Sequence, residues 1–182
     1  LVGSSTSNDG QVSGNHGGSD VWVIKLNPGG SIEWQKCLGG SESEEAVTVL
    51  LASDGGYLIG GHTRSNDGDV SINKGGSDIW LVKLSESGSM EWEKTYGGSD
   101  WDQCSSIILS NDNSYVIAGS TASNDGDVNG NHGSYDHWIL KVDQMGNIEW
   151  QKCIGGSDYD QPSDILLASD GYYYILGFAQ ST

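Results

Sequence analysis

The segment DIWLVKLSESGSMEWEK at residues 78–94 returns 58 residues later as DHWILKVDQMGNIEWQK at residues 136–152. A third version, DVWVIKLNPGGSIEWQK, occupies residues 20–36 at the same spacing. Residues 39–96 align on 97–154 with 24 identities and no insertion. The tripeptide Gly-Gly-Ser keeps the same period and begins at Gly39, Gly97 and Gly155. A gap-free period of this length indicates a structural repeat that buries its apolar faces against copies of itself.

Each repeat is predicted to contain four β-strands. Short runs rich in valine, isoleucine, tyrosine and tryptophan alternate with glycine, asparagine and aspartate, the residues of tight turns. No long window shows a sustained helical period, so we expect almost no helix. The long polar loop of the second repeat is expected at 64–77. The strands of this repeat are expected at 46–51, 57–61, 78–84 and 90–96.

The apolar pattern of these strands predicts a β-propeller. The first three strands are apolar on both faces, whereas the fourth alternates Met90 and Trp92 with two glutamates and so leaves one face in water. A four-stranded antiparallel unit covered by its own copies is a propeller blade with its last strand at the outer rim. A β-solenoid is the alternative, although it favours shorter coils. We therefore expect an all-β propeller with about three 58-residue blades per chain.

The repeat organises the chain as a single domain. Closed propellers usually need at least four blades, so the chain is expected to be either a fragment of a longer propeller or half of a six-bladed ring closed by a second chain. Residues 1–3 and 175–177 would compete for one strand position in such a ring, which favours the fragment. We expect the third and fourth strands of a blade at 1–38 and full blades at 39–96 and 97–154. The first and second strands of a further blade are expected at 155–182.

Charge and cysteine content exclude several classes of protein. The net charge is −17, with only 8 Lys and Arg against 25 Asp and Glu, so no basic stripe is available for nucleic acid. No apolar stretch reaches the length of a membrane span, and we expect no membrane insertion. The odd number of cysteines lacks the spacing of a disulfide framework. Cys37, Cys104 and Cys153 are therefore expected to be small buried hydrophobic residues.

The pattern Asp-x-Trp-x-x-Lys followed by Gly-x-x-x-Trp-x-Lys, at 78–94 and 136–152, resembles the bacterial β-propeller repeat of secreted and cell-surface proteins. It is similar, more loosely, to the pyrroloquinoline-quinone-type propeller blade. Surface proteins of the Bacteroidetes kind, exported by the type IX route, carry comparable Gly-Gly-Ser and Ser-Asn-Asp-Gly-Asp units. The resemblance covers the whole chain and implies a secreted or cell-surface bacterial protein. It specifies no activity, because propellers bind, scaffold and catalyse.

A loop between the second and third strands is the best candidate for a metal site. Residues 125–136 follow the pattern Asp-x-Asp-x-Asn-Gly with an acidic residue at the twelfth position. Ca²⁺ takes six to eight oxygen ligands, and alternate side chains of such a loop can converge on one ion. The alternative is turn chemistry, in which Asp side chains bond to nearby backbone. The expected ligands are Asp125, Asp127, Asn129, the Asn131 carbonyl and Asp136.

The other copies of this loop depart from the pattern. The middle copy keeps its carboxylates but has Ile72 in place of the glycine, and the first copy has Gln11 in place of the second aspartate. The ligands expected in the middle copy are Asp67, Asp69, Ser71 and Asp78, and those in the first are Asp9, Ser13 and Asp20.

The loops after the second and fourth strands should lie on one face of a propeller, because consecutive strands of a blade are antiparallel. If a ligand binds, this face is the expected place, and an aromatic ring beside carboxylates could stack on a sugar. Packing of the same aromatic residues between blades is the favoured alternative. The candidate residues are Asp100, Trp101, Asp102, Asp158, Tyr159 and Asp160.

Repeat-constant tryptophans and scattered histidines point to structure rather than catalysis. The tryptophans are expected in the core between blades. They are Trp22, Trp80 and Trp138 in one row and Trp34, Trp92 and Trp150 in another. No Ser–His–Asp or Cys–His arrangement emerges, and an enzyme acting in the central channel would be expected to break the repeat at a few polar positions.

We therefore expect a non-enzymatic extracellular propeller module for adhesion, display or protein interaction, stabilised by Ca²⁺ and without an organic cofactor. The alternative is a multivalent lectin with sites on the acidic loop face. Expected partners are other copies of the repeat or another chain that closes the ring, and glycans or surface proteins.

Overall fold

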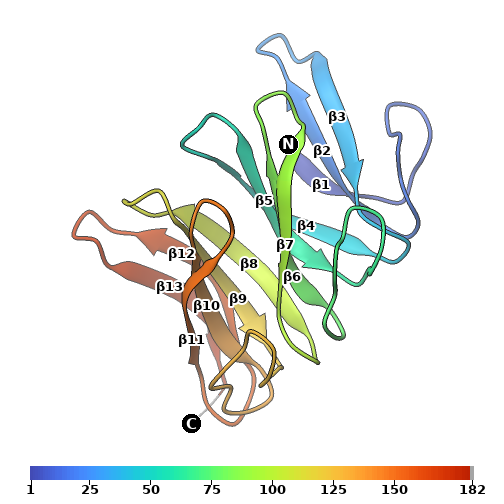
Figure 1. Cartoon of the computed structure of the whole chain (residues 1–182). Coiled ribbons are helices and arrows are strands. Elements are labelled where there is room, and N and C mark those ends of the chain that lie inside the picture. Colours follow the sequence, from blue (N-terminus) through green and yellow to red (C-terminus); the bar gives the residue numbers. More distant parts are fainter. Residues whose placement is uncertain (181–182) are drawn as a thin grey trace. The chain divides into compact units, whose positions relative to one another are not determined.

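The computed structural model describes residues 1–180 and consists of β-strands joined by turns and loops (Figure 1). Thirteen strands form four antiparallel sheets, and no helix occurs within the described residues. The all-β prediction is confirmed. The last two residues of the range predicted at 155–182 lie outside the described residues. As a separate finding, the described part of the chain contains no helix long and apolar enough to cross a membrane.

The four sheets follow one another along the sequence. The first has the order β1 (Val2–Ser5), β2 (Asp20–Leu26), β3 (Ile32–Leu38). The second has the order β4 (Glu44–Leu51), β5 (Tyr57–Thr63), β6 (Asp78–Leu84), β7 (Met90–Tyr96). The third contains β8 (Asp102–Leu109), β9 (Tyr115–Thr121), β10 (Asp136–Val142), β11 (Ile148–Ile154), and the fourth β12 (Asp160–Leu167) and β13 (Tyr173–Ala179). The four strands predicted for the second repeat match β4 to β7 within two residues.

The repeat extends to irregular details of the sheets. The strands β4, β8 and β12 take the same place in the repeat, and each has a register shift at the same repeat position. These shifts lie between Ala46 and Thr48, between Cys104 and Ser106, and between Pro162 and Asp164. The turn between the third and fourth strands needs a left-handed residue, supplied by Gly88 with φ of 82° and Gly146 with φ of 78°.

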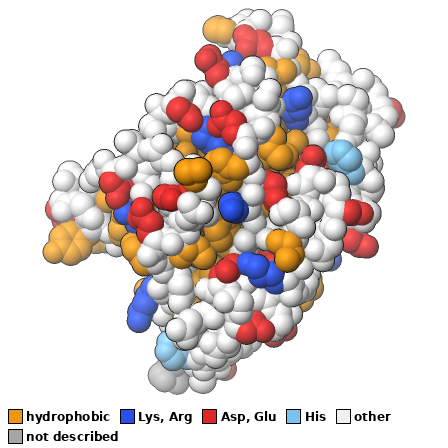
Figure 2. Space-filling view, viewed as in Figure 1, with side chains coloured by type: hydrophobic (Ala, Val, Ile, Leu, Met, Phe, Trp, Pro, Cys, Tyr) orange, Lys and Arg blue, Asp and Glu red, His pale blue; other side chains and the backbone are white. Residues whose placement is uncertain are grey.

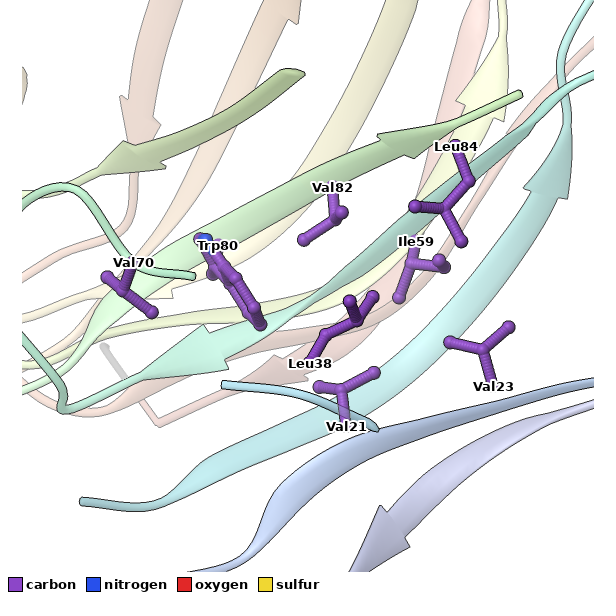
Figure 3. Packing of buried hydrophobic residues seen from close by; sticks show 8 residues of the cluster. All are labelled: Val21, Val23, Leu38, Ile59, Val70, Trp80, Val82 and Leu84. Atoms are coloured by element: carbon purple, nitrogen blue, oxygen red, sulfur yellow. The ribbon is translucent and has the colours of Figure 1, made fainter. Parts of the chain in front are cut away.

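The chain forms two compact units, each described by itself. The first comprises Leu1–Asn73 and Trp80–Thr95, and the second comprises Lys74–Ile79 and the residues from Tyr96 onward. Each unit has its own core of apolar side chains. Figure 3 shows the core of the first unit, formed by Val21, Val23, Leu38, Ile59, Val70, Trp80, Val82 and Leu84. The core of the second unit contains Val116, Ala118, Ile139 and Ile165.

The two rows of tryptophans have different environments. Trp80 and Trp138 are buried, as predicted, and each donates its indole N–H to the fourth strand, to Glu93 at 2.8 Å and Gln151 at 2.9 Å respectively. In the row formed by Trp34, Trp92 and Trp150, the side chains are only partly buried, and Trp150 is 38% exposed. Trp34 and Trp150 each pack instead on the tyrosine that begins the second strand of the next sheet. Ring centroids are 5.9 Å apart for Trp34–Tyr57 and 6.3 Å apart for Trp150–Tyr173.

The cysteines are buried and free, as predicted. Burial raises the pKa of the Cys104 thiol to about 12 and that of Cys153 to about 11. Because the thiolate is the reactive form, these side chains act as small apolar groups rather than as nucleophiles.

Candidate functional site at the junction loops

Consecutive sheets meet through two families of loops, here called the junction loops. One family follows the last strand of a sheet, and the other joins the second strand of a sheet to its third. The sequence predicted that the two families share a face, and the structure brings them into contact. The Asp67 carboxylate accepts a hydrogen bond from the Ser41 N–H at 2.7 Å, and Asp125 accepts one from Ser99 at 2.7 Å. The same contact therefore recurs 58 residues apart.

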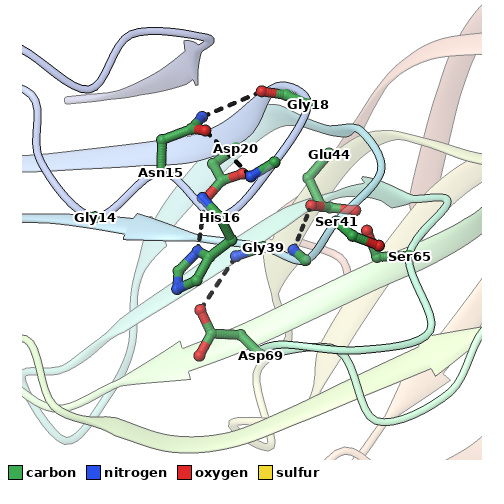
Figure 4. Close-up of polar contacts among 12 residues, drawn as sticks. Gly14, Asn15, His16, Gly18, Asp20, Gly39, Ser41, Glu44, Ser65 and Asp69 are labelled. Carbon is green, nitrogen blue, oxygen red and sulfur yellow. Dashed lines mark hydrogen bonds and ion pairs between the residues drawn. The ribbon is translucent and has the colours of Figure 1, made fainter.

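Each junction also places two buried acidic side chains around one glycine; we call these the carboxylate pairs. One acid is the first residue of β2, β6 or β10, the strand that takes the third position in the four-stranded repeat. The other is the first residue of the next sheet, so the pair ties consecutive sheets together. All six carboxylates are at most 1% exposed. The pairs are Asp20 and Glu44 around Gly39, Asp78 and Asp102 around Gly97, and Asp136 and Asp160 around Gly155. Figure 4 shows the first junction.

The carboxylates leave no space for a side chain at the glycine. A Cβ at Gly155 would lie 2.6 Å from an Asp136 oxygen and 2.7 Å from an Asp160 oxygen. At Gly97 a Cβ would lie under 3.0 Å from both carboxylates. None of these three glycines has a positive φ. Close packing on carboxylates is therefore the specific reason for the first glycine of the repeated Gly-Gly-Ser.

The two acids of a pair have unequal hydrogen bonding. Asp102 accepts bonds from the Gly98 N–H at 2.8 Å, the Ser123 hydroxyl at 2.8 Å and the Thr121 hydroxyl. In Asp78, Oδ2 accepts the Lys74 N–H at 2.8 Å, whereas Oδ1 has no hydrogen-bond partner. Within residues 1–180, Oδ1 of Asp20 and Oδ1 of Asp136 are likewise buried without a hydrogen-bond partner. In all three junctions the unpartnered oxygen is the one beside the glycine.

Burial and mutual proximity change the acidity of the middle pair. Burial raises the pKa of Asp78 to about 6; the Lys74 N–H opposes this rise, and the Asp102 charge adds to it. Burial also raises the pKa of Asp102, against the hydrogen bonds from Thr121, Gly98 and Ser123. Because two buried like charges at this range disfavour each other, Asp78 should bind a proton as the pH falls through about 6.

The carboxylates of the predicted calcium loop are bound to separate groups. Asp125 bonds to the Ser99 N–H, as described above. Asp127 accepts the Gly97 N–H at 3.2 Å and forms an ion pair with Lys74. Lys74 stands where the other two copies have histidine, so this ion pair is particular to one junction.

The remaining predicted ligands are also engaged in hydrogen bonds. The Asn129 carbonyl accepts a bond from Gln151 at 3.1 Å, and the Asn131 amide donates to the Ser123 carbonyl at 3.1 Å. Asp136 belongs to a carboxylate pair, and its Oδ2 is 2.7 Å from the His132 ring nitrogen. The structure thus places these five residues in one loop, with different partners for each.

The weaker candidate loop has the same organisation. Asp67 and Asp69 accept hydrogen bonds from the Gly-Gly-Ser that follows β3, and the Ser71 N–H donates to Glu93 at 3.3 Å. Asp78 belongs to a carboxylate pair. Within residues 1–180, no three His, Cys, Asp or Glu side chains are grouped so that they could hold a metal ion.

The candidate ligand face is divided between buried and exposed residues. Asp102 and Asp160 belong to carboxylate pairs. Trp101 is 37% exposed, and its ring covers Gly76, where a Cβ would lie 2.7 Å from the indole. Tyr159 packs on Tyr135 with ring centroids 5.0 Å apart. The favoured alternative, in which these aromatics pack at the junctions, agrees with these contacts. Asp100 and Asp158 are exposed.

Sequence reasoning missed the carboxylate pairs as units. The signal was present, because an acid follows the Gly-Gly-Ser at the same position in all three copies, as Glu44, Asp102 and Asp160. This signal was difficult to recognise because the chain has 25 Asp and Glu, most of which have other roles or positions. Figure 2 shows such acidic side chains across the visible face, in red.

Comparison with known proteins gives one distant similarity. No family model matches the chain. The regulatory protein FlaEY of Caulobacter vibrioides is 27% identical over 165 residues, which cover 85% of this chain and 17% of FlaEY. The chain therefore corresponds to less than a fifth of that protein's length.

Proposed function

We propose that the chain is a non-enzymatic β-propeller repeat module, secreted or displayed on a bacterial surface, that serves adhesion, display or protein interaction. The observation that carries the proposal is the junction built three times from the same parts. Sheets joined in series by identical contacts are what a propeller or a related repeat scaffold requires. In this reading the repeat-constant residues hold the scaffold together, and partners bind to exposed loops and edges.

The relation to FlaEY is compatible with this proposal. The name of that protein describes a regulatory role, and a module that binds other proteins could contribute to regulation as well as to adhesion. Its similarity covers most of this chain, so the shared part is the repeat scaffold itself.

The location and the adhesive role can be tested together on the source bacterium. Antibodies against the purified chain should label intact cells, and beads coated with the folded chain should attach to them. Beads coated with heat-unfolded chain are the matched control. Labelling that appears only after cell lysis would contradict the surface location, and equal attachment of both bead types would contradict the adhesive role.

A lectin is the second candidate, and one observation favours it. Trp101, which is partly exposed, directly follows the exposed Asp100 in the sequence, and an aromatic ring and a carboxylate together could contact a sugar. A glycan array probed with the parent chain and with Trp101→Ala tests it. Binding that the substitution removes supports the lectin, and silence across the array rejects it.

A further inference from the structure

One side chain of the junction loops differs between the copies of the repeat. It is histidine in the first and third copies, as His16 and His132, and lysine in the second, as Lys74. In each copy the backbone N–H of this residue donates to the buried aspartate four residues later, at 3.0 Å, 2.8 Å and 3.1 Å along the chain. The backbone contact is therefore kept in all three copies, and the junctions differ in the side chain at this position.

At the junction around Gly97, the lysine side chain binds a carboxylate. Lys74 Nζ forms an ion pair with Asp127, whose Oδ2 also accepts the Gly97 N–H at 3.2 Å. The side chains of Lys74 and Asp127 are only 28% and 26% exposed, so water is partly excluded from the ion pair. The place beside Asp127 is thus filled by a primary ammonium group that the chain itself supplies.

The junction around Gly39 has the same carboxylate without the ammonium group. Asp69 stands 58 residues before Asp127 and accepts the Gly39 N–H at 3.1 Å. None of the ion pairs among the described residues involves Asp69. His16 stands in place of the lysine, and its Nδ1 lies 2.7 Å from Asp20 Oδ2. Figure 4 shows the side chains of this junction.

A pocket of about 370 Å³ lies at this junction. His16 and Asp69 line it, together with Leu38 and Met90, which supply apolar surface. A carboxylate accepts strong hydrogen bonds from an ammonium group, and apolar side chains favour an alkyl chain. The pocket therefore suits a ligand that has both parts.

A lysine also lines the pocket without excluding a second cation there. Lys36 is exposed, so its ammonium group is solvated and opposes a neighbouring charge only weakly. Lys94 stands at the same repeat position in the second copy. The ion pair between Lys74 and Asp127 forms in the presence of that lysine.

We propose that this pocket binds a primary ammonium group carried on an alkyl chain, in the place that Lys74 fills at the other junction. The Asp69 carboxylate accepts the N–H bonds of the ligand, and the alkyl chain lies along Leu38 and Met90. A free alkyl amine and the side chain of a peptide lysine both offer this chemistry. The inference goes beyond the proposed function, because it requires neither a surface location nor adhesion.

Titration with n-butylammonium chloride at constant ionic strength, followed by amide NMR, tests the site. The Gly39 amide, which donates to Asp69, should shift and reach a plateau. Asp69→Asn should weaken binding about tenfold or more, because it removes the charge that the ammonium group contacts. Tetramethylammonium is the control for general attraction to a chain of net charge −17, since it has the same charge as the ligand but no N–H donor.

An exchange of side chains between the two junctions gives a sharper comparison. His16→Lys places an ammonium group beside Asp69 and should abolish the response of the Gly39 amide. Lys74→His removes the ammonium group beside Asp127 and should make the Gly97 amide respond to n-butylammonium. Each variant introduces a residue that another junction already has, so both should fold like the parent, which thermal unfolding checks.

A second ligand distinguishes the sources of the ammonium group. A plateau with both n-butylammonium and Nα-acetyl-lysine amide supports a site that accepts a lysine side chain, whereas a plateau with n-butylammonium alone supports a site for free amines. A parent chain that gives no plateau with either ligand overturns the inference. An equal response to tetramethylammonium, or a His16→Lys variant that binds n-butylammonium as the parent does, also overturns it.

Discussion

Asp78 and Asp102 lie on either side of Gly97, with their nearest carboxylate oxygens within about 6 Å of each other, close enough for each charge to affect the other's pKa. Both side chains are fully buried, and they begin strands in consecutive sheets. Oδ1 of Asp78 has no hydrogen-bond partner among the residues that the structure describes. The charge of this aspartate is therefore the least compensated part of the junction, and its protonation should affect stability.

Replacing Asp78 by asparagine should stabilise the protein at pH 7.5. The folded-state pKa of about 6 lies above the ordinary value of 3.8, so the folded chain binds this proton more tightly than the unfolded chain. The contribution of Asp78 is most favourable below about pH 4 and is lost as the pH rises through 6. Asp78→Asn should therefore gain about 2–3 kcal/mol over the parent at pH 7.5. Urea unfolding from pH 4 to pH 8 measures this difference.

The matched control is Glu42→Gln, which neutralises an exposed acid. Its difference from the parent should stay small across the pH range. An Asp78→Asn variant that is less stable than the parent at every pH would show that the buried charge is compensated by contacts other than those described.

Gly97→Ala should destabilise the protein because of crowding rather than backbone strain. The new methyl group would lie under 3.0 Å from both carboxylates. Overpacking of this kind costs about 1–3 kcal/mol. Gly3→Ala is the control, since no heavy atom would lie within 4 Å of its Cβ. Thermal unfolding of both variants checks the prediction, and equal melting temperatures would refute the close approach.

Lys83 should stabilise its sheet mainly through its aliphatic stem. Burial lowers the pKa of Lys83, but the hydrogen bonds that its ammonium donates to Asp54 and Glu91 outweigh that effect, and the pKa is raised. Those two acids are 56% and 44% exposed, so water can replace the lysine. Lys83→Ala should cost about 1–3 kcal/mol through lost packing, and Lys83→Met should recover most of it. Similar losses in both variants, measured by urea unfolding, would assign the stabilisation to the charge.

Calcium binding at residues 125–136 should compete with the ion pair between Lys74 and Asp127. Lys74→Ala removes a cation from one predicted ligand and should strengthen Ca²⁺ binding in calorimetric titration. Lys152→Ala removes an exposed lysine within β11, outside the predicted calcium loop, and should leave the Ca²⁺ affinity unchanged. If neither the parent nor Lys74→Ala binds Ca²⁺, the calcium site predicted from the sequence is rejected.

The strands could be predicted from the sequence because their determinants are local. The runs 78–84 and 90–96 contain β-formers bounded by turn residues, and the structure has strands with those bounds. The burial of Trp80 was predictable from its place in an apolar strand. The partial exposure of Trp150 was not, because it depends on how far the next sheet extends over β11.

The carboxylate pairs could not be predicted from local pattern. Asp78 and Asp102 belong to different sheets, and each looks like an ordinary turn or strand-end acid in its own segment. Their relation arises only when consecutive sheets pack. The calcium-like spacing of 125–136 illustrates the opposite case, since a local motif suggested convergence while the structure gives Asp125 and Asp127 separate partners.

Each junction is shared between two consecutive repeats, since Asp78 belongs to one repeat and both Gly97 and Asp102 belong to the next. Duplication of any 58-residue stretch, starting at any point of the period, would therefore reproduce a complete junction without a compensating mutation. Deletion of one 58-residue period would likewise join equivalent repeat positions and so restore a complete junction. Genes of this kind can lengthen or shorten by recombination between repeats, and each product would keep an acid on both sides of every junction glycine.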